Sequence, residues 1–208
     1  MNSALIVFMK AARKGYVKTR LAESIGDELA LEVYRNLIDR TMNAVRESES
    51  ICRAFIYIDD ETYRLQVSET IGVPAGELQI QSSGDLGEKM SHAFSDILEG
   101  RSFDRAVIIG TDLADINVSI IKEALDCLDA SDLVIGPAFD GGYYLLGLKE
   151  LHKNLFQNIN WSTSSVLRQT IAHAKKKGIN FSLLEEKRDI DTLEDLGHAD
   201  LGSYTGIQ

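Results

Sequence analysis

Apolar residues along this chain follow two alternating patterns: short continuous runs, and longer stretches in which they recur every three or four residues. A short apolar run bounded by turn residues is typical of a buried strand, whereas the longer spacing is typical of a helix with one buried face. The clearest helical stretch is Asp27–Glu47, where Ala30, Val33 and Leu37 belong to one apolar stripe.

These patterns predict strands and helices in near-regular alternation. The expected strands are Ala4–Met9, Ile51–Ile58, Glu77–Gln81, Arg105–Ile109, Leu133–Ile135, Tyr143–Leu148 and Asn180–Leu184. The expected helices are Asp27–Glu47, Glu61–Ile71, Glu88–Leu98, Asn117–Leu128, Ser164–Lys177 and Thr192–Asp200. Such alternation predicts one α/β domain over residues 1–208, with a mainly parallel sheet between two helical layers. Ligands bind at the carboxyl ends of strands in these sheets, so functional residues are sought directly after each strand.

The charge balance narrows the range of functions. The formal net charge is −10, which argues against a nucleic-acid-binding protein, because affinity for a phosphate backbone needs a broad basic surface. A small phosphorylated ligand needs only a local basic pocket. The two cysteines form no C-x-x-C motif, so neither a disulfide framework nor a zinc site is expected. The first apolar run is too short for a signal peptide or a membrane span, and we expect a cytoplasmic protein.

The loop after the first strand, KGYVKTRL, is basic within an acidic chain. Its neighbourhood carries the cations Arg13, Lys14, Lys18 and Arg20. It is not a Walker-A loop, because Val17 stands where a glycine is needed and a β-branched residue does not easily adopt positive φ. The local excess of cations is a candidate phosphate site. The structural alternative is that these cations pair with Glu23 or Asp27 on the surface.

Carboxylates follow two further strands. Asp112 comes just after the strand at Arg105–Ile109, where it could hold a divalent cation that bridges a diphosphate, or cap a turn. Asp115 more simply begins the next helix. Asp189 and Asp191 are two positions apart, so in an extended segment they face the same side and repel each other. A cation or the neighbouring Arg188 would relieve that repulsion.

Alternative structural roles compete at several of these positions. Asp191 or Thr192 could cap the last helix, and Ser162 or Thr163 could cap the helix after Trp161. Trp161 itself is either a stacking platform for a ring or a core residue.

Two turns add candidate ligand contacts. Asp140, Gly141 and Gly142 form a hairpin signal, and the glycines also permit a ligand to approach the main chain closely. Both interpretations hold together if Asp140 points into the site. Gly84 and Asp85 precede a helix; Asp85 with Glu88 predicts a capping box, and the helix N-terminus is also a potential anion site.

Taken together, the motifs GYVKTRLA, GDLGEKM, IIGTDLAD, DGGYYLLGL, WST and DIDTLEDL resemble, over nearly the whole chain, a group of small bacterial proteins. These are assigned as glycosyltransferases of the nucleotide-diphospho-sugar transferase superfamily, and some are named selenodomain-associated transferases. Relatives at the level of the fold include guanylyltransferases. The chain departs from that group in lacking prolines in its first loop and in carrying Ala114 where a proline is usual.

The resemblance implies a GT-A-like fold and a metal-dependent glycosyltransferase with a nucleotide-diphospho-sugar donor and an unknown acceptor. Lys18 and Arg20 would neutralise the diphosphate, Mg²⁺ or Mn²⁺ would be held by Asp112 with Asp189 or Asp191, and Asp140 would orient the sugar or act as a base. A homodimer is one assembly that we consider. The alternatives are a nucleotidyltransferase acting on a phosphorylated small molecule, and a non-catalytic nucleotide-sugar-binding protein.

Overall fold

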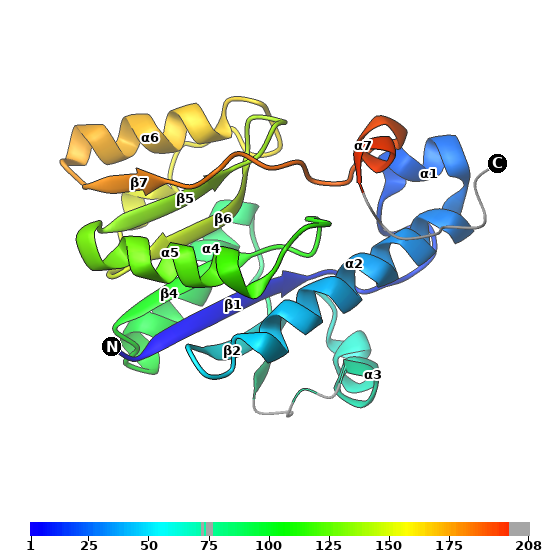
Figure 1. Ribbon diagram of the computed structural model, residues 1–208, viewed down its shortest axis with the longest axis horizontal. Coiled ribbons are helices and arrows are strands. Elements are labelled where there is room, and N and C mark those ends of the chain that lie inside the picture. Colours follow the sequence, from blue (N-terminus) through cyan, green and yellow to red (C-terminus); the bar gives the residue numbers. More distant parts are fainter. Residues whose placement is uncertain (72, 74–76, 200–208) are drawn as a thin grey trace.

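Seven strands form one twisted sheet in the computed structural model, which describes residues 1–71, 73 and 77–199 (Figure 1). The strands are β1 Ser3–Met9, β2 Arg53–Ile58, β3 Leu78–Ile80, β4 Arg105–Ile109, β5 Leu133–Pro137, β6 Tyr143–Leu148 and β7 Phe181–Leu183. Their order across the sheet is β3-β2-β1-β4-β6-β5-β7. β6 runs antiparallel to β4 and β5, and the other neighbouring pairs are parallel. The predicted α/β class with a mostly parallel mixed sheet is therefore confirmed.

Helices connect these strands at nearly the positions that the apolar spacing predicts. They are α1 Thr19–Ile25, α2 Asp27–Glu47, α3 Glu61–Ile71, α4 Leu86–Ser95, α5 Val118–Ala130, α6 Val166–Lys177 and α7 Leu193–His198. A π-helical turn, Asp96–Gly100, extends α4, and a short 3-10 helix covers Lys153–Leu155. α1 was not expected from the sequence. The predicted end of the last helix, Asp200, lies outside the described residues. Among the described helices, none is long and apolar enough to cross a membrane.

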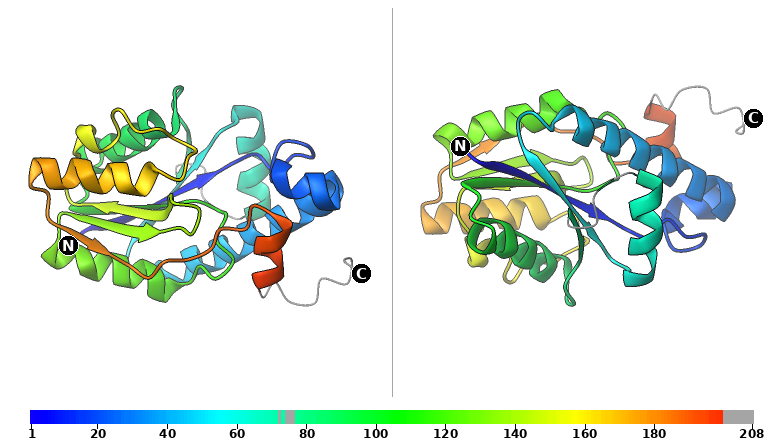
Figure 2. Two further views of the ribbon diagram at one scale, coloured as in Figure 1. Left: turned by 90° about the horizontal axis from the view of Figure 1, so that it is seen from above. Right: turned by 90° about the horizontal axis from the view of Figure 1, so that it is seen from below.

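Each face of the sheet is covered by its own helices, as the views from above and below show (Figure 2). α2, α3 and α5 pack on one face, where Tyr34 and Ile121 belong to a common core with strand residues such as Val7. α4 and α6 pack on the other face, where Phe94 and Ala174 lie in a second core. The three-layer arrangement follows from alternating strand residues pointing to opposite faces.

A third, smaller core lies beyond the carboxyl ends of the strands. It joins Leu21 of α1, Leu37 of α2 and Ile190 of the segment before α7. Figure 1 shows α1 and α7 side by side at this end of the molecule, and residue contacts join the two helices. The cluster fixes the basic first loop and the acidic last segment against the same end of α2.

Some predicted helix caps are present and others are wrong. Asp85 and Glu88 form the expected capping box at α4, and Thr192 forms one with Asp195 at α7.

The cap of α5 is Asn117 rather than Asp115, because the Asn117 side chain accepts hydrogen bonds from Ser119 N and Ile120 N. α6 begins after Ser165, so neither Ser162 nor Thr163 is its N-cap. Instead, the Thr163 hydroxyl donates to the Asn160 carbonyl.

The topology creates a crevice between β1 and β4. From β1 the chain proceeds outward through β2 and β3, then returns to β4 on the other side of β1. Ligands of open α/β sheets bind at such a switch point. The segment after β7 crosses this edge on its way to α7 and forms isolated β-bridges, Leu113 with Asp189 and Ala138 with Lys187. It thereby brings the last acidic motif to the end of β4.

Candidate functional site

A cavity of about 810 Å³ lies at the carboxyl edge of the sheet, between the end of β1 and the β5–β6 turn. Residues from many separate segments of the chain line it, among them Arg20, Asp112, Asp140, Tyr143, Trp161 and Asp191. Several of the predicted site residues, far apart in sequence, therefore share one wall.

Lys18 is the most buried charged side chain of the site. Its ammonium nitrogen lies 2.5 Å from Asp112 Oδ1 and 3.5 Å from Asp191 Oδ1, and its side chain is 2% exposed. The backbone of Lys18 has φ of 50°, a left-handed conformation in front of α1. Burial alone would lower the pKa of this amine, but the carboxylates of Asp112, Asp191 and Asp189 outweigh it and raise the pKa. Lys18 is thus a fixed cation at the centre of an acidic cluster.

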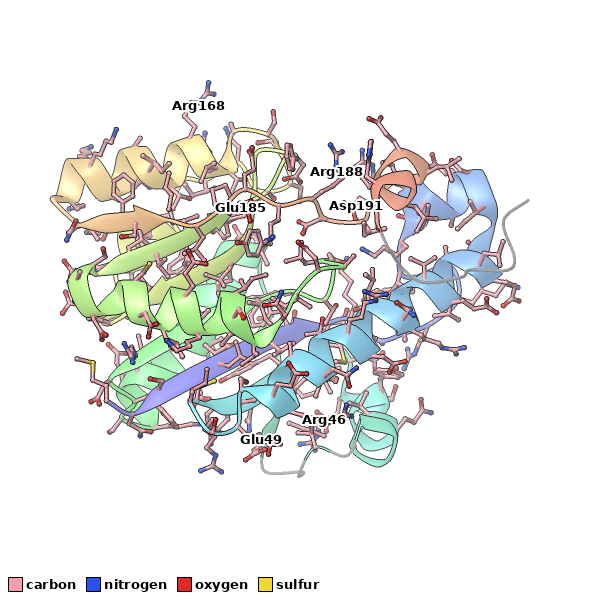
Figure 3. All side chains as sticks on the ribbon, in the orientation of Figure 1. Arg46, Glu49, Arg168, Glu185, Arg188 and Asp191 are labelled. Atoms are coloured by element: carbon pink, nitrogen blue, oxygen red, sulfur yellow. The ribbon has the colours of Figure 1, made fainter. Side chains whose placement is uncertain are left out.

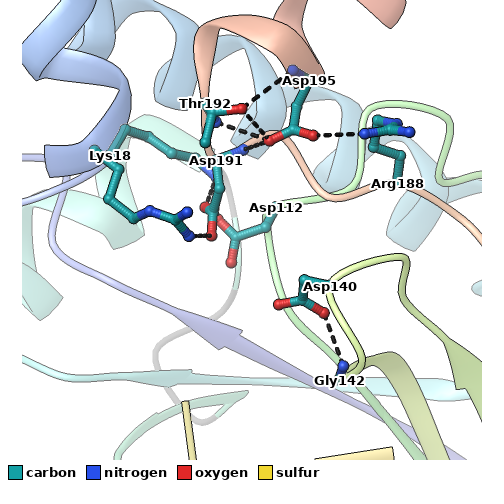
Figure 4. A network of polar contacts seen from close by, with 9 residues as sticks. Lys18, Asp112, Asp140, Gly142, Arg188, Asp191, Thr192 and Asp195 are labelled. Carbon is teal, nitrogen blue, oxygen red and sulfur yellow. Dashed lines mark hydrogen bonds and ion pairs between the residues drawn. The ribbon is translucent and has the colours of Figure 1, made fainter. Parts of the chain in front are cut away.

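Arg20 lies at the rim of the same cluster. Its guanidinium is 3.8 Å from Asp191 Oδ2, and its side chain is 68% exposed, so most of its hydrogen-bond donors are free for a ligand. Lys18 and Arg20 therefore share Asp191, while Lys18 also holds Asp112. Figure 4 shows Lys18, Asp112 and Asp191 converging, with Asp140 across from them.

Asp189 is the carboxyl group of this site whose pKa departs most from its ordinary value. Burial and the nearby Asp112 carboxylate raise its pKa to about 8, although Lys18 acts in the opposite direction. At neutral pH the Asp189 carboxyl is therefore mostly protonated, because its charge would add to that of the neighbouring carboxylates. A further cation bound beside it would favour the ionised form.

The β5–β6 turn presents Asp140 to the cavity. β5 and β6 form the antiparallel hairpin that the Asp-Gly signal predicted. Gly142 N donates a hydrogen bond to Asp140 Oδ1 at 2.8 Å, which fixes the carboxylate. Gly141 has φ of 87°, and a Cβ there would lie 2.3 Å from the carbonyl oxygen of Ser164. Only glycine fits this turn without displacing its neighbour.

An aromatic wall faces these polar groups. Trp161 and Tyr143 pack edge to face with ring centroids 6.5 Å apart. Trp161 is partly buried against the core under α4 and α6, where it also packs on Gly87. Trp161 therefore contacts the core and also borders the cavity, and its role as a stacking platform stays a prediction.

Some of the predicted binding residues lie elsewhere. Lys14 pairs with Glu28 on the exposed surface and does not line the cavity. Gly84, Asp85 and Gly141 also do not line it, although Leu86, Lys89 and Gly142 do.

The expected pairings of the acidic residues are only partly present. Arg188 pairs with Asp195 and not with Asp189 or Asp191, so Lys18 and Arg20 supply the compensating charge. Asp115 pairs with Lys187.

Polar residues of this cavity that were not singled out from the sequence include Tyr34, Asp59 and Gln81. The Tyr34 hydroxyl contacts Thr111 Oγ1 at 2.9 Å and accepts from Lys10 N at 2.9 Å, so it joins the ends of β1 and β4. Asp59 and Gln81 directly follow β2 and β3. The rule that selected Asp112, a polar residue at a strand's carboxyl end, would also have selected them.

The donor set suits a hard divalent cation. Asp112 and Asp191 are about half-exposed carboxylates that line the cavity, and Asp189 lies beside them. Within residues 1–71, 73 and 77–199, no group of three or more metal-ligating side chains is preassembled. Mg²⁺ does not need one, since it retains water and is commonly held by one or two carboxylates together with substrate phosphates.

A second cavity, of about 700 Å³, opens at the amino ends of β1 and β2 and is bordered by Arg46 and Glu49. Figure 3 shows those two residues well away from Asp191 and Arg188. None of the predicted site residues lines it, so the chemistry described above belongs to the first cavity.

An open sheet with its switch point between β1 and β4, and with cations and carboxylates gathered there, is an architecture suited to a nucleotide-dependent transferase. Solved structures agree. The crystal structure of a "putative nucleotide-diphospho-sugar transferase" from Desulfovibrio desulfuricans G20 superimposes with a TM-score of 0.84 and 30% identity, covering 94% of this chain and 85% of that one. A 4-diphosphocytidyl-2C-methyl-D-erythritol synthase from Anaerococcus prevotii DSM 20548 shares the fold alone, with a TM-score of 0.60 and 10% identity over 95% of this chain and 97% of its own.

The chain belongs to the DUF2064 family, because the model of that family matches residues 41–163. The description of the family is "Uncharacterized protein conserved in bacteria". It is also 29% identical over 184 residues to the 2-phospho-L-lactate guanylyltransferase of Methanocaldococcus sp. (strain FS406-22), an alignment that covers 87% of this chain and 74% of that protein. The predicted superfamily, its relation to guanylyltransferases and the transferase class are confirmed. Glycosyl transfer itself is not confirmed. The guanylyltransferase relative supports the nucleotidyltransferase alternative better than it supports a glycosyltransferase.

Proposed function

We propose that this protein is a metal-dependent nucleotidyltransferase that joins a nucleoside triphosphate to a phosphorylated small molecule. An acceptor phosphate oxygen would attack the α-phosphorus, the bond from that phosphorus to the β-phosphate oxygen would break, and pyrophosphate would leave. The observation that carries the proposal is that Lys18 and Arg20 pair with Asp112 and Asp191 at one cavity, which Arg20 and the two carboxylates line. The similarity to a guanylyltransferase supports transfer of a nucleotidyl group.

The basic residues of the first loop would bind the phosphate chain. Lys18 offers a compact ammonium that would move from Asp112 toward a phosphate oxygen, and the exposed guanidinium of Arg20 can contact two phosphate oxygens at once. Such cations stabilise charge that accumulates on a leaving pyrophosphate. Asp112, with Asp189 or Asp191, would hold Mg²⁺ or Mn²⁺. When bound, this ion would supply further neutralisation of the leaving group.

The other end of the cavity would receive the acceptor. Asp140 is held at the β5–β6 turn, and Tyr143 and Trp161 offer apolar surface beside it. An acceptor phosphate is ionised at neutral pH and needs no general base. Asp140 would therefore orient polar groups of the acceptor and would not remove a proton from it.

Glycosyl transfer from a nucleotide-diphospho-sugar is the second candidate, and the 30% identity to the Desulfovibrio protein favours it. In that reaction the acceptor is a hydroxyl group, and Asp140 would take its proton. The leaving group is then a nucleoside diphosphate, held by the same cations.

Product analysis separates the two. The purified protein is incubated with Mg²⁺ or Mn²⁺, a panel of phosphorylated and hydroxylated acceptors, and either nucleoside triphosphates or nucleotide sugars. Phosphorus NMR should detect pyrophosphate formed from a triphosphate only when a phosphorylated acceptor is present. Release of nucleoside diphosphate from a nucleotide sugar, without any pyrophosphate, would select the second candidate. Metal-independent binding without turnover of any donor would instead indicate a binding protein.

A further inference from the structure

β7 (Phe181–Leu183) is an edge strand of the sheet, and β5 is its one neighbour among the described strands. In the view from above, β7 lies between α6 and α5, and no other described element covers its outer side (Figure 2). Sheet edges usually avoid pairing with another chain through a proline, a charged residue or a bulge. β7 contains no proline and no charged residue, and its ladder with β5 has no register shift. The edge is therefore open to a further strand.

The main-chain groups of β7 point alternately toward β5 and away from it. Leu184 N donates to the Ile135 carbonyl at 2.9 Å, and Leu133 N donates to the Asn180 carbonyl at 3.1 Å. Since each second residue of a strand bonds to the same neighbour, the N–H and C=O groups of Phe181 and Leu183 face outward. Among the described residues, none bonds to these four groups. β7 thus offers two donors and two acceptors to a further strand.

Two copies of β7 can satisfy each other's outward groups in an antiparallel pair. In such a pair, opposed residues exchange both of their main-chain hydrogen bonds at each second position. With a two-fold axis at Ser182, Phe181 lies opposite Leu183 of the second copy, and Leu183 opposite its Phe181. All four outward groups of each copy then have partners. A two-fold interface requires self-complementarity of this kind.

Apolar side chains accompany these main-chain groups. Leu183 is 49% exposed. Phe181 shares its face of the sheet, because side chains two positions apart point the same way, and Phe181 is only partly buried against the core under α4 and α6. In the antiparallel pair, Leu183 lies beside Phe181 of the second copy. Cross-strand apolar pairs of this kind stabilise a sheet.

The charges at the two ends of β7 favour the same direction of pairing. Before the strand, α6 ends in three exposed lysines at positions 175–177, and after the strand follow the exposed Glu185 and Glu186. An antiparallel partner brings the basic end of each copy to the acidic end of the other. A parallel partner would instead bring like charges together, which opposes association.

We propose that β7 is the interface through which two copies of this chain join their sheets into one continuous sheet. A second copy is the occupant because the hydrogen-bonding groups, the apolar side chains and the charges of β7 all complement themselves about one axis. The carboxyl edges of the two sheets, with their cavities, then face opposite ways. Each copy keeps its own site, so this inference is independent of the proposed function.

The first test is sedimentation velocity on the unaltered protein, at chain concentrations from about 1 μM to about 1 mM. A species of twice the chain mass should appear and increase with concentration. Leu183→Lys places a charge on the edge and should raise the dissociation constant of the dimer at least about 10-fold. Leu193→Lys is the matched control, because Leu193 is 45% exposed but lies on α7, and it should dimerise like the unaltered protein.

The second test reverses the charge at either end of β7. One variant carries Glu185→Lys and Glu186→Lys, and the other carries Lys176→Glu and Lys177→Glu. Each alone should dimerise at least about 10-fold more weakly than the unaltered protein, because like charges then meet. An equimolar mixture should regain the dimer, since each variant supplies the charge that the other lacks. Circular dichroism checks that every variant is folded.

The proposal is overturned if the unaltered protein stays monomeric at every concentration. It is also overturned if the dimer survives Leu183→Lys, or if the two charge-reversed variants are folded but do not combine. A monomer whose β7 edge binds an extended peptide from another protein would show that the occupant is not a second copy.

Discussion

The ammonium nitrogen of Lys18 lies 2.5 Å from Asp112 Oδ1, although 94 positions separate the two residues in the chain. The contact joins the basic loop after β1 to the acidic end of β4. In the free protein Lys18 thus occupies a position among carboxylates where a metal ion would also be stabilised. A phosphate chain that draws Lys18 toward itself would release Asp112, so we expect metal and nucleotide to assist each other's binding.

Replacing Lys18 with Met should therefore have two effects. Loss of the ammonium leaves Asp112 without its ion-pair partner and Asp191 with Arg20 alone. Removing one partner of a fully buried pair costs about 3–5 kcal/mol, which the half-exposed carboxylates here reduce to about 1–3 kcal/mol. In addition, Mn²⁺ without nucleotide should raise the melting temperature of this variant more than that of the unaltered protein.

Lys14→Met is the matched control for this experiment, because Lys14 pairs with Glu28 where both side chains are exposed. It should change neither the melting temperature nor the response to Mn²⁺ measurably. A Lys18→Met protein that behaves like this control would show that Lys18 does not balance the carboxylate cluster.

Asp189 predicts a pH dependence of stability in the metal-free protein. Burial raises its pKa from 3.8 to about 8, so the folded state binds this proton more tightly than the unfolded state. The resulting stabilisation is complete below pH ~4 and is lost as the pH rises to about 8. Because an asparagine side chain does not ionise, the Asp189→Asn variant should not lose stability in this way as the pH rises. In EDTA we expect the variant and the unaltered protein to be similarly stable near pH 4, and the variant to be more stable at pH 8 by up to about 5 kcal/mol, the value that corresponds to the full shift.

Urea unfolding across this pH range measures the effect. If the difference in unfolding free energy between the two proteins is constant with pH, Asp189 is an ordinary carboxylate.

The β5–β6 turn predicts a large difference between two glycine substitutions. Gly178→Ala places a Cβ in open space, so it should cost only the strain of its left-handed backbone, about 1–2 kcal/mol. Gly141→Ala has the same kind of strain and also drives a Cβ against the main chain of Ser164, so about 2–4 kcal/mol is expected.

Because Asp140 is fixed by this turn, the Gly141 variant should also lose turnover, which the Gly178 variant should keep. Chemical denaturation together with the product assay checks both. Equal stabilities for the two variants would mean that the turn relaxes freely around Gly141.

The sequence was sufficient for much of the fold because its apolar spacing is regular. α2 was predicted with its observed bounds since its apolar stripe runs for many turns, and β4 and β6 since each is a clean apolar run. α1 was missed because Thr19–Ile25 is short and is separated from α2 only by Gly26, so its apolar positions are too few to show a period.

The candidate site was only partly visible in the sequence for a different reason. Topology brings the ends of parallel strands to one edge, so the approach of the first loop to Asp112 could be anticipated. The direct pairing of Lys18 with Asp112 depends on a left-handed backbone at a lysine, which no sequence pattern indicates. Likewise, Arg188 was expected beside Asp189, but the helix cap at α7 draws it to Asp195.

The central claim is that Lys18, Arg20 and Asp112 act on a single pyrophosphate group, and calorimetric titration with pyrophosphate tests it without any assumption about the base. The unaltered protein should bind pyrophosphate at least about 10-fold more tightly with Mn²⁺ than without it. Asp112→Asn should lose this metal-dependent gain, and Arg20→Met should weaken binding in both conditions. Asp115→Asn, the control for a nearby carboxylate that pairs with Lys187, should behave like the unaltered protein. A metal-dependent gain of full size in Asp112→Asn would contradict the account.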